Sequence, residues 1–237
     1  MGNLLVQDKS VVVPGEAIAE GMDFLPASGT FREGEKIIAS KLGLINVDGR
    51  VVRLIPLAGK YLPKSGDTII GKVSDVTFSG WRLEINSAYT AMLGLKDATS
   101  SFIMRGADLT KFFTFGDFIV AKIINVTSQN LVDLTLKGPG LRKLSEGRMI
   151  YVSPHKVPRI IGKQGSMVMM LKESTGCNIV VGQNGVIWLS GKPEDEIKAV
   201  SAIRKIEAES HMSGLTERIK THLGNGNTGE NNDIQQA

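Results

Sequence analysis

The sequence predicts a multidomain fold that is mainly β in its first two thirds and α+β in its last third. Short apolar runs separated by Gly and Pro fill the beginning of the chain, a Gly-Asp motif occurs twice in the middle, and a Gly-x-x-Gly loop lies between two helical runs near the end. With 237 residues and 42% hydrophobic content, the chain can form several small cores. We expect domains at residues 1–63, 64–146 and 147–223, followed by a disordered tail at 224–237.

Residues 1–63 are predicted to form a β-rich domain. Strand composition is found at Val11–Val13 and Lys36–Ser40, and the runs Leu42–Val47 and Arg50–Ile55 flank Asp48-Gly49 as the two strands of a hairpin would. The ionisable residues of this region show no catalytic spacing, and its positive and negative charges balance. A domain of this kind suits docking against another protein or domain, although a purely structural role fits nearly as well.

The middle segment contains an internal repeat. The motif Gly66–Val73 recurs fifty residues later as Gly116–Ile123, and each copy is a Gly-Asp turn that leads into a strand. Further strand candidates are Trp81–Ile85, Tyr89–Leu93 and Leu131–Leu136. Five short strands with one long internal connection are typical of a five-stranded OB-type barrel, whose strands and loops bind single-stranded nucleic acid.

The last third is organised around the loop Gly162-Lys163-Gln164-Gly165. A strand-like run, Met149–Val152, and a short apolar turn, Val157–Ile161, precede the loop, and a helical run, Met167–Glu173, follows it. Glycines without Cβ atoms let a sugar-phosphate backbone approach the loop closely. This pattern is typical of the KH domain, whose Gly-x-x-Gly loop clamps about four nucleotides.

The remainder of this segment completes the pattern β-α-α-β-β-α, which is the type I KH arrangement. Two strand-like runs, Asn178–Val181 and Val186–Leu189, flank Gly182-Gln183-Asn184-Gly185, a predicted hairpin turn in which Asn-Gly supplies positive φ. A last helix is expected from Pro193, because acidic residues occupy its first turn. Apolar residues then follow at three-residue steps: Ile197, Val200, Ile203 and Ile206.

Composition limits the functional classes. The net charge of +4 has its positive excess in residues 64–146 and 147–223, which suits nucleic acid but also an ordinary solvated surface. The single cysteine, Cys177, excludes an internal disulfide framework and a four-cysteine zinc site, and is expected to be a small buried residue. Neither a run of about 18 apolar residues nor a leader-like N-terminus is present, so we expect a soluble, cytoplasmic protein without membrane contact.

Catalytic chemistry is not expected. No Gly-Lys pair is followed by Ser or Thr, as a phosphate-binding loop would require, and the three histidines have no metal-ligand spacing. We therefore predict no enzymatic activity, no metal and no cofactor.

Four segments resemble one known family, the RNA-binding cap subunit of the exosome in its archaeal form: Pro14-Gly15-Glu16, Tyr61–Asp67, Arg159–Gly162 and Gly182–Gly185. The resemblance extends over nearly the whole chain up to the tail, and it makes the barrel an S1 domain. It implies three cap subunits on a hexameric ring of RNase PH-like subunits. The cap binds single-stranded RNA and guides its 3′ end into the ring without cutting it.

On this interpretation the N-terminal domain docks on the ring, the barrel lines the entry pore, and the KH domain adds outer RNA contacts. The nearest alternative is a free-standing S1/KH factor of translation or transcription. An RNA-processing enzyme is the alternative from another class.

The residues expected to bind RNA lie in both the barrel and the KH domain. Ile160, Ile161 and Val180 could form an apolar groove beneath the bases or belong to the core, and Trp188 is expected to pack rather than stack. Phe78 and Trp81 are the aromatic candidates of the barrel, and the methionines at 167, 169 and 170 are expected to fill a helix. The predicted RNA-binding residues are Lys72, Trp81, Arg105, Lys111, Lys122, Lys156, Arg159, Ile161, Gly162, Lys163, Gln164 and Gly165.

Overall fold

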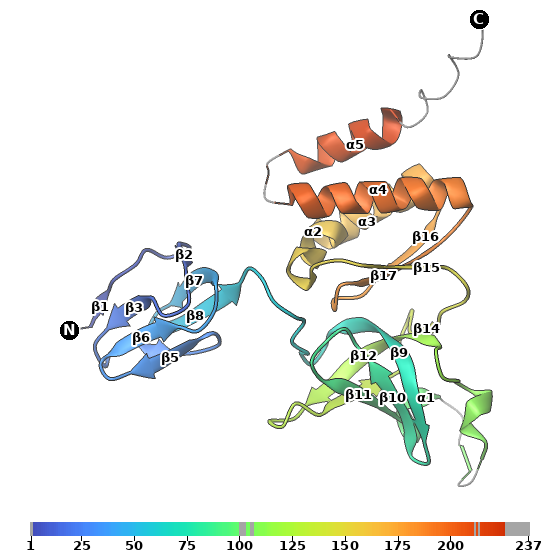
Figure 1. Ribbon diagram of the computed structural model, residues 1–237, viewed down its shortest axis with the longest axis horizontal. Coiled ribbons are helices and arrows are strands. Elements are labelled where there is room, and N and C mark those ends of the chain that lie inside the picture. The colour runs from blue at the N-terminus through green and yellow to red at the C-terminus, as the bar shows by residue number, and fades with distance from the viewer. Residues whose placement is uncertain (1, 100–102, 105–106, 211, 213, 226–237) are drawn as a thin grey trace, which may run out of the picture. The chain divides into compact units, whose positions relative to one another are not determined.

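The computed structural model describes residues 2–99, 103–104, 107–210, 212 and 214–225 (Figure 1). The chain divides into two compact units, of which the first ends at Gly59 and the second begins at Lys60. The predicted fold class is confirmed, because a β-rich N-terminal domain, a closed five-stranded barrel and a KH domain follow one another along the chain. Among the described residues, no helix has both the length and the apolar character needed to cross a membrane.

The N-terminal unit contains two four-stranded sheets. The first has the strand order β1-β3-β6-β5, with strands β1 (Asn3–Leu4), β3 (Ala17–Glu20), β6 (Lys36–Ala39) and β5 (Thr30–Glu33). The second has the order β2-β7-β8-β4, with strands β2 (Val11–Val12), β7 (Gly43–Asp48), β8 (Val51–Pro56) and β4 (Leu25–Pro26).

Alternating side chains of these strands form one small core. Val12, Ile45 and Leu54 are buried there together with Ile18 and Ile37 of the first sheet. The predicted hairpin is present. Strands β7 and β8 pair from Gly43 opposite Pro56 to Asp48 opposite Val51, around a turn in which Gly49 has a φ of 60°.

The barrel is built from five strands and closes on itself. Strand β13 pairs in parallel with β11 and antiparallel with β12, so the sheet has no free edge between these strands. The long connection contains two short helices, α1 (Leu95–Ala98) and η1 (Leu109–Lys111), and an additional strand, β14 (Arg142–Lys143), pairs with β12. The barrel strands are β9 (Thr68–Thr77), β10 (Gly80–Glu84), β11 (Thr90–Gly94), β12 (Phe118–Val126) and β13 (Val132–Thr135).

The repeated Gly-Asp motif produces an approximate two-fold symmetry inside the barrel. Its two copies begin β9 and β12, which are antiparallel neighbours: Thr68 pairs with Lys122, and Lys72 pairs with Phe118. The glycine N–H of each turn donates to the carbonyl of the last motif residue in the other copy, at 2.8 and 2.9 Å. The repeat therefore closes both ends of one strand pair with the same local sequence.

The KH domain has a three-stranded antiparallel sheet of order β15-β17-β16, with helices over one face (Figure 1). Its core includes Ile150, Val157, Leu171 and Ile203. The strands are β15 (Arg148–Tyr151), β16 (Asn178–Val181) and β17 (Val186–Ser190). The helices are η2 (Pro154–Lys156), α2 (Val157–Ile161), η3 (Lys163–Gly165), α3 (Ser166–Thr175), α4 (Pro193–Glu209) and α5 (Leu215–Asn225).

The C-terminal helices differ from the prediction. Helix α5 was not predicted as a separate element, although Leu215 and Ile219 are four residues apart and are both buried in the KH core. In α4 the small residues Ala199 and Ala202 are fully buried, whereas Ile197 is exposed. The predicted tail begins at the last two residues of α5, and its remainder, 226–237, lies outside the described residues.

The β16–β17 turn docks the KH domain on the barrel. The Asn184 side chain accepts a hydrogen bond from the Ile70 N–H at 3.3 Å and donates to the carbonyls of Ile70 and Ile85 at 2.8 and 2.9 Å. Gln183 donates its N–H to the Thr68 carbonyl and accepts from the Thr68 N–H, both at 2.9 Å. Because β10 pairs only with the later part of β9, this turn occupies an edge that would otherwise expose unpaired backbone groups.

An apolar cluster lies beside this docking turn. It joins Ile70 and Val120 of the barrel to Val186 and Trp188 of the KH sheet. Trp188 is buried and donates its indole N–H to the Ser145 carbonyl at 3.2 Å, which confirms that it packs. The barrel and the KH domain thus share one continuous contact.

Candidate nucleic-acid interface

The Gly-x-x-Gly loop connects α2 to α3 through a tight, left-handed bend. Gly162 has a φ of 76° and its N–H donates to the Pro158 carbonyl at 3.0 Å, which ends α2. Gln164 and Gly165 also have positive φ, at 54° and 81°. Three of the four loop residues therefore have positive φ, a backbone conformation that glycine adopts readily and other residues adopt uncommonly.

The two glycines are needed for different reasons. A Cβ atom on Gly162 would lie 2.7 Å from both the backbone nitrogen and the Cβ of Met167, so helix packing forbids it. A Cβ on Gly165 would have only Val168 near it, at 4.0 Å, so its surroundings are open. Gly165 thus leaves free the space through which a nucleic-acid backbone would approach.

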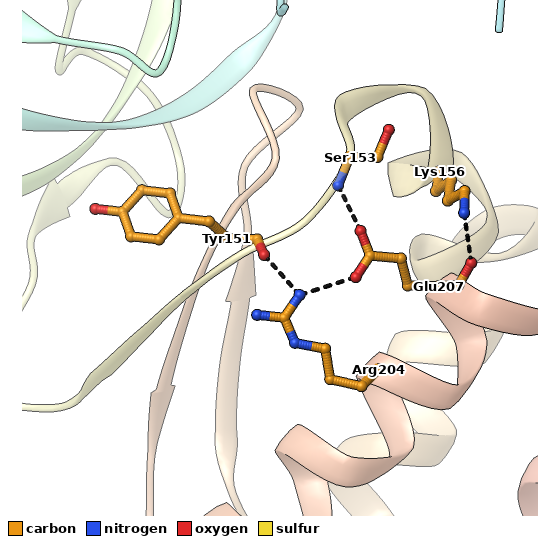
Figure 2. A network of polar contacts seen from close by, with 5 residues as sticks. All are labelled: Tyr151, Ser153, Lys156, Arg204 and Glu207. Atoms are coloured by element: carbon orange, nitrogen blue, oxygen red, sulfur yellow. Dashed lines mark hydrogen bonds and ion pairs between the residues drawn. The ribbon is translucent and has the colours of Figure 1, made fainter. Parts of the chain in front are cut away.

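A polar network fixes the segment that leads into the loop (Figure 2). The Glu207 carboxylate of α4 accepts from the Ser153 N–H at 2.7 Å and from the Arg204 guanidinium at 2.9 Å. Arg204 also donates to the Tyr151 carbonyl at 2.9 Å, and the Lys156 ammonium donates to the Glu207 carbonyl at 2.9 Å. These bonds tie the end of β15 and the start of η2 to α4, so that α2 begins from a defined position.

The structure separates the predicted KH residues into two groups. Lys163, Gln164 and Arg159 are exposed on the loop and on the helix before it, where they can meet a phosphate backbone. Ile161 is half-buried and packs against the KH core. The ammonium of Lys156 donates a hydrogen bond to the Glu207 carbonyl of α4 at 2.9 Å, so one of its donors is engaged inside the KH domain, and its contribution of positive charge to RNA binding stays a prediction.

Three residues were expected either to form an apolar groove beneath the bases or to belong to the core, and two of them pack internally. Ile160 is fully buried in the KH core. Val180 packs against the cluster between the KH sheet and the barrel. Both side chains are therefore occupied by internal packing and leave Ile161 as the half-buried candidate.

The prediction that Trp81 stacks on RNA is wrong. Its side chain is 0% exposed, its indole N–H donates to the Phe113 carbonyl at 3.0 Å, and its ring meets the Phe113 ring edge-on at 5.1 Å. Trp81 alternates toward the inside of the closed barrel, where it forms part of the core. Phe78, in the β9–β10 turn, is 96% exposed and remains the aromatic candidate.

Lys72 and Lys122 are exposed and occupy equivalent positions of the two-fold strand pair. They lie on one outward face, about 13 Å apart along the strands, and Ile70 and Val120 between them are covered by the KH domain. The two lysines therefore flank the docked domain instead of forming one patch. Lys111 is exposed at the end of η1, and Arg105 lies outside the described residues.

Two features of the site were not predictable from the sequence. The Gly182–Gly185 turn was expected to be an ordinary hairpin turn with positive φ at Asn-Gly, but only Gly185 has positive φ and Asn184 is buried against the barrel. Tyr151 exposes 52% of its surface beside the barrel, which strand alternation alone does not reveal. Both depend on how the KH sheet meets the barrel.

Two side chains have raised pKa values, and both shifts fit structural roles for these residues. Burial raises the pKa of the Cys177 thiol, which fits the expected small buried residue and not a reactive thiolate. Burial, together with the hydrogen bond from its hydroxyl to Asp67 at 2.6 Å, raises the pKa of Tyr61. In the part of the chain that the structure describes, no group of three or more His, Cys, Asp or Glu side chains could hold a metal ion.

Comparison with protein families finds three matches in the order of the three domains. Residues 9–58 match the family model described as the exosome RNA binding protein RRP4 N-terminal domain. Residues 60–105 match the RRP4 S1 domain, and residues 147–195 match a KH domain. The N-terminal match distinguishes this chain from S1/KH proteins that lack such a domain.

Individual relatives are similar over nearly the whole chain. A protein of Methanothermobacter thermautotrophicus, named exosome complex component Rrp4, is 44% identical over 93% of this chain and 70% of its own length. A Pyrococcus furiosus protein of the same name is 45% identical over 94% of this chain and 86% of its own length. A crystal structure described as an exosome complex RNA-binding protein has 35% identity and a TM-score of 0.65, covering 71% of this chain and 98% of that one. Together with the three domain matches, these identities show that the chain belongs to the Rrp4 family of exosome components.

Proposed function

We propose that the chain is a non-catalytic RNA-binding cap subunit, which holds single-stranded RNA and guides its 3′ end into a hexameric ring of RNase PH-like subunits, with three cap subunits on each ring. The Gly-x-x-Gly loop is the observation that supports this function most strongly. Its backbone is open at Gly165, and its two variable residues, Lys163 and Gln164, are exposed. Such a loop recognises a sugar-phosphate backbone and not a small metabolite.

The test of the loop is a double variant, Lys163→Asp with Gln164→Asp. Two carboxylates would repel phosphates at the point of closest approach, so we expect the affinity for single-stranded RNA to fall about tenfold or more while the melting temperature stays the same. The matched control is Asn3→Asp with Lys41→Asp, which makes the same change in charge on exposed residues of the N-terminal unit. Equal RNA affinity in the loop variant and the wild type would remove the loop from the mechanism.

The ring-docking surface that we propose is the outward face of the second N-terminal sheet. Val11, Leu44 and Ile55 lie side by side on three neighbouring strands, and Val11 and Ile55 are 57% and 49% exposed. Contiguous apolar patches on a protein surface mark interaction sites more often than single exposed residues do. The patch continues at the strand ends and consists of Val11, Val13, Leu42, Leu44, Ile55 and Leu57.

The other sheet of the same unit provides a contrast. Its outward face bears a row of charges in which Lys36 stands between Glu20 and Glu33. The next row on that face, Phe31 and Ile38, is apolar, and the second sheet carries the exposed ion pair between Arg53 and Asp48 beyond its patch. What sets the second sheet apart is that its apolar patch extends over three strands and their ends, which suits a large protein partner.

Ile55→Lys tests this surface. A charge in the middle of the apolar patch would have to be desolvated on docking, so we expect the variant not to co-elute with the RNase PH-like ring while its RNA affinity and melting temperature are unchanged. Phe31→Lys, at an exposed apolar position of the first sheet, is the control and should co-elute normally. Co-elution of Ile55→Lys at the wild-type level would place the docking surface elsewhere.

A further inference from the structure

A small hollow lies where the barrel meets the KH sheet. Its volume is about 160 Å³, below the range of roughly 300–1,000 Å³ typical of pockets for whole small-molecule ligands. Lys72, Glu84, Asn86 and Phe118 line it from the barrel, and Tyr151 and Val186 line it from the KH domain. The hollow is therefore a composite of both domains and is too small for a complete cofactor.

The strand registers bring different kinds of side chain to one row. Lys72 of β9 lies directly between Phe118 of β12 and Glu84 of β10, so a cation, an aromatic ring and a carboxylate are neighbours on one face of the barrel. Tyr151 faces this row from β15, where it pairs with Val186 of β17. Its backbone carbonyl is bound by Arg204, whereas its ring points away from α4 (Figure 2).

We propose that this hollow holds the base of one nucleotide of the RNA strand, with preference for a base that has an exocyclic amino group. The proposal rests on the proposed RNA-binding function and adds a site to it. Tyr151 provides a face on which the base stacks, Lys72 neutralises the adjacent phosphate, and the Glu84 carboxylate accepts a hydrogen bond from the amino group. Uracil has a carbonyl oxygen at the position where cytosine has its amino group. This oxygen and the Glu84 carboxylate are both hydrogen-bond acceptors, so they cannot bond to each other.

The position of the hollow suits a continuous strand. It lies at the edge of the contact in which Ile70 and Val186 pack together, so a strand bound there touches both domains at once. Asn86 is held in place because its side-chain amide donates to the Asn184 carbonyl at 2.8 Å, which connects the wall of the hollow to the docking turn. The site therefore depends on the docked arrangement of barrel and KH domain.

The experiment measures binding of the full chain to labelled oligocytidylate and oligouridylate of equal length, about 12 nucleotides, by fluorescence anisotropy. The wild type is expected to bind the cytidylate about tenfold more tightly. Glu84→Gln is expected to bind both oligonucleotides equally, because a carboxamide offers an acceptor to cytosine and a donor to uracil. The control is Glu33→Gln, an exposed strand carboxylate of the N-terminal unit, which should keep the wild-type ratio.

Tyr151 is tested on the same two oligonucleotides. Tyr151→Leu is expected to lower both affinities about tenfold without changing their ratio, and Tyr151→Phe, which keeps the ring, should bind like the wild type. Phe31→Leu, at another exposed strand aromatic, is the control. If Glu84→Gln keeps the wild-type preference, or if Tyr151→Leu binds like the wild type, the hollow is not a nucleotide site, and RNA binding through the glycine loop still stands. A wild-type chain that binds neither oligonucleotide overturns both the hollow and the proposed function.

Discussion

Among single residues, the two glycines of the Gly-x-x-Gly loop differ in what requires them. Gly162 is required by packing, because any Cβ would strike the backbone of Met167. Gly165 is required by its positive φ and faces open space. Lys163 and Gln164, between them, are exposed, and they are the residues that we propose to contact RNA.

These two glycines should respond differently to alanine. Gly165→Ala is expected to cost about 1–2 kcal/mol of unfolding free energy, because it keeps a left-handed backbone without a clash, and also to weaken RNA binding, because its methyl group enters the approach path. Gly162→Ala is expected to cost more, because strain and steric overlap add. Urea denaturation checks both values, and equal destabilisation by the two variants would contradict the different roles given to them.

Some of these residue roles were predictable from the sequence and others were not. The loop was predictable because strand, helix and glycine signals all lie within about one supersecondary unit. The burial of Trp81 was not, since strand alternation defines two faces but does not say which one a closed barrel turns inward. The hydrogen bond of Lys156 was not predictable either. A lysine near the loop suggests a phosphate ligand, but its ammonium donates to a carbonyl of α4, fifty-one positions away.

At the scale of elements, the β16–β17 turn acts as a substitute strand. Gln183 and Asn184 form with β9 the kind of paired bonds that a neighbouring strand would form. The sequence identifies the turn from Asn-Gly, but the partner of Asn184 is 114 positions away, so no local pattern could reveal the contact. Helix α5 is a different case, because the spacing of Leu215 and Ile219 did contain its signal.

Substitutions in this turn should have graded effects. Asn184→Ala leaves buried backbone groups of Ile70 and Ile85 unpaired and is expected to destabilise the protein by about 3 kcal/mol and to separate unfolding of the barrel and KH domain into two transitions. Gln183→Ala, at an exposed edge, is expected to cost about 1 kcal/mol and to keep a single transition. Differential scanning calorimetry distinguishes these results, and a wild-type profile for Asn184→Ala would show that the turn does not couple the domains.

In the chain as a whole, each of the two compact units has its own proposed function. The N-terminal unit presents an apolar patch on its second sheet and is proposed to dock on the ring through it. The unit that begins at Lys60 joins barrel and KH domain through one contact and offers RNA the glycine loop and the composite hollow. The order of the three domains was predictable from strand, repeat and loop signals, whereas the contact surfaces required the folded chain.

The most direct test is degradation of 5′-labelled RNA in phosphate and Mg²⁺ by the RNase PH-like ring, with and without this chain. We predict that the purified chain alone leaves the RNA intact and that it accelerates shortening by the ring when RNA is limiting. Ile55→Lys and the double variant Lys163→Asp with Gln164→Asp should each remove the acceleration, the first by loss of docking and the second by loss of RNA. Shortening by the chain alone after careful purification, or an equal rate for the ring with and without the chain, would show that the chain is not a non-catalytic cap that delivers RNA to the ring.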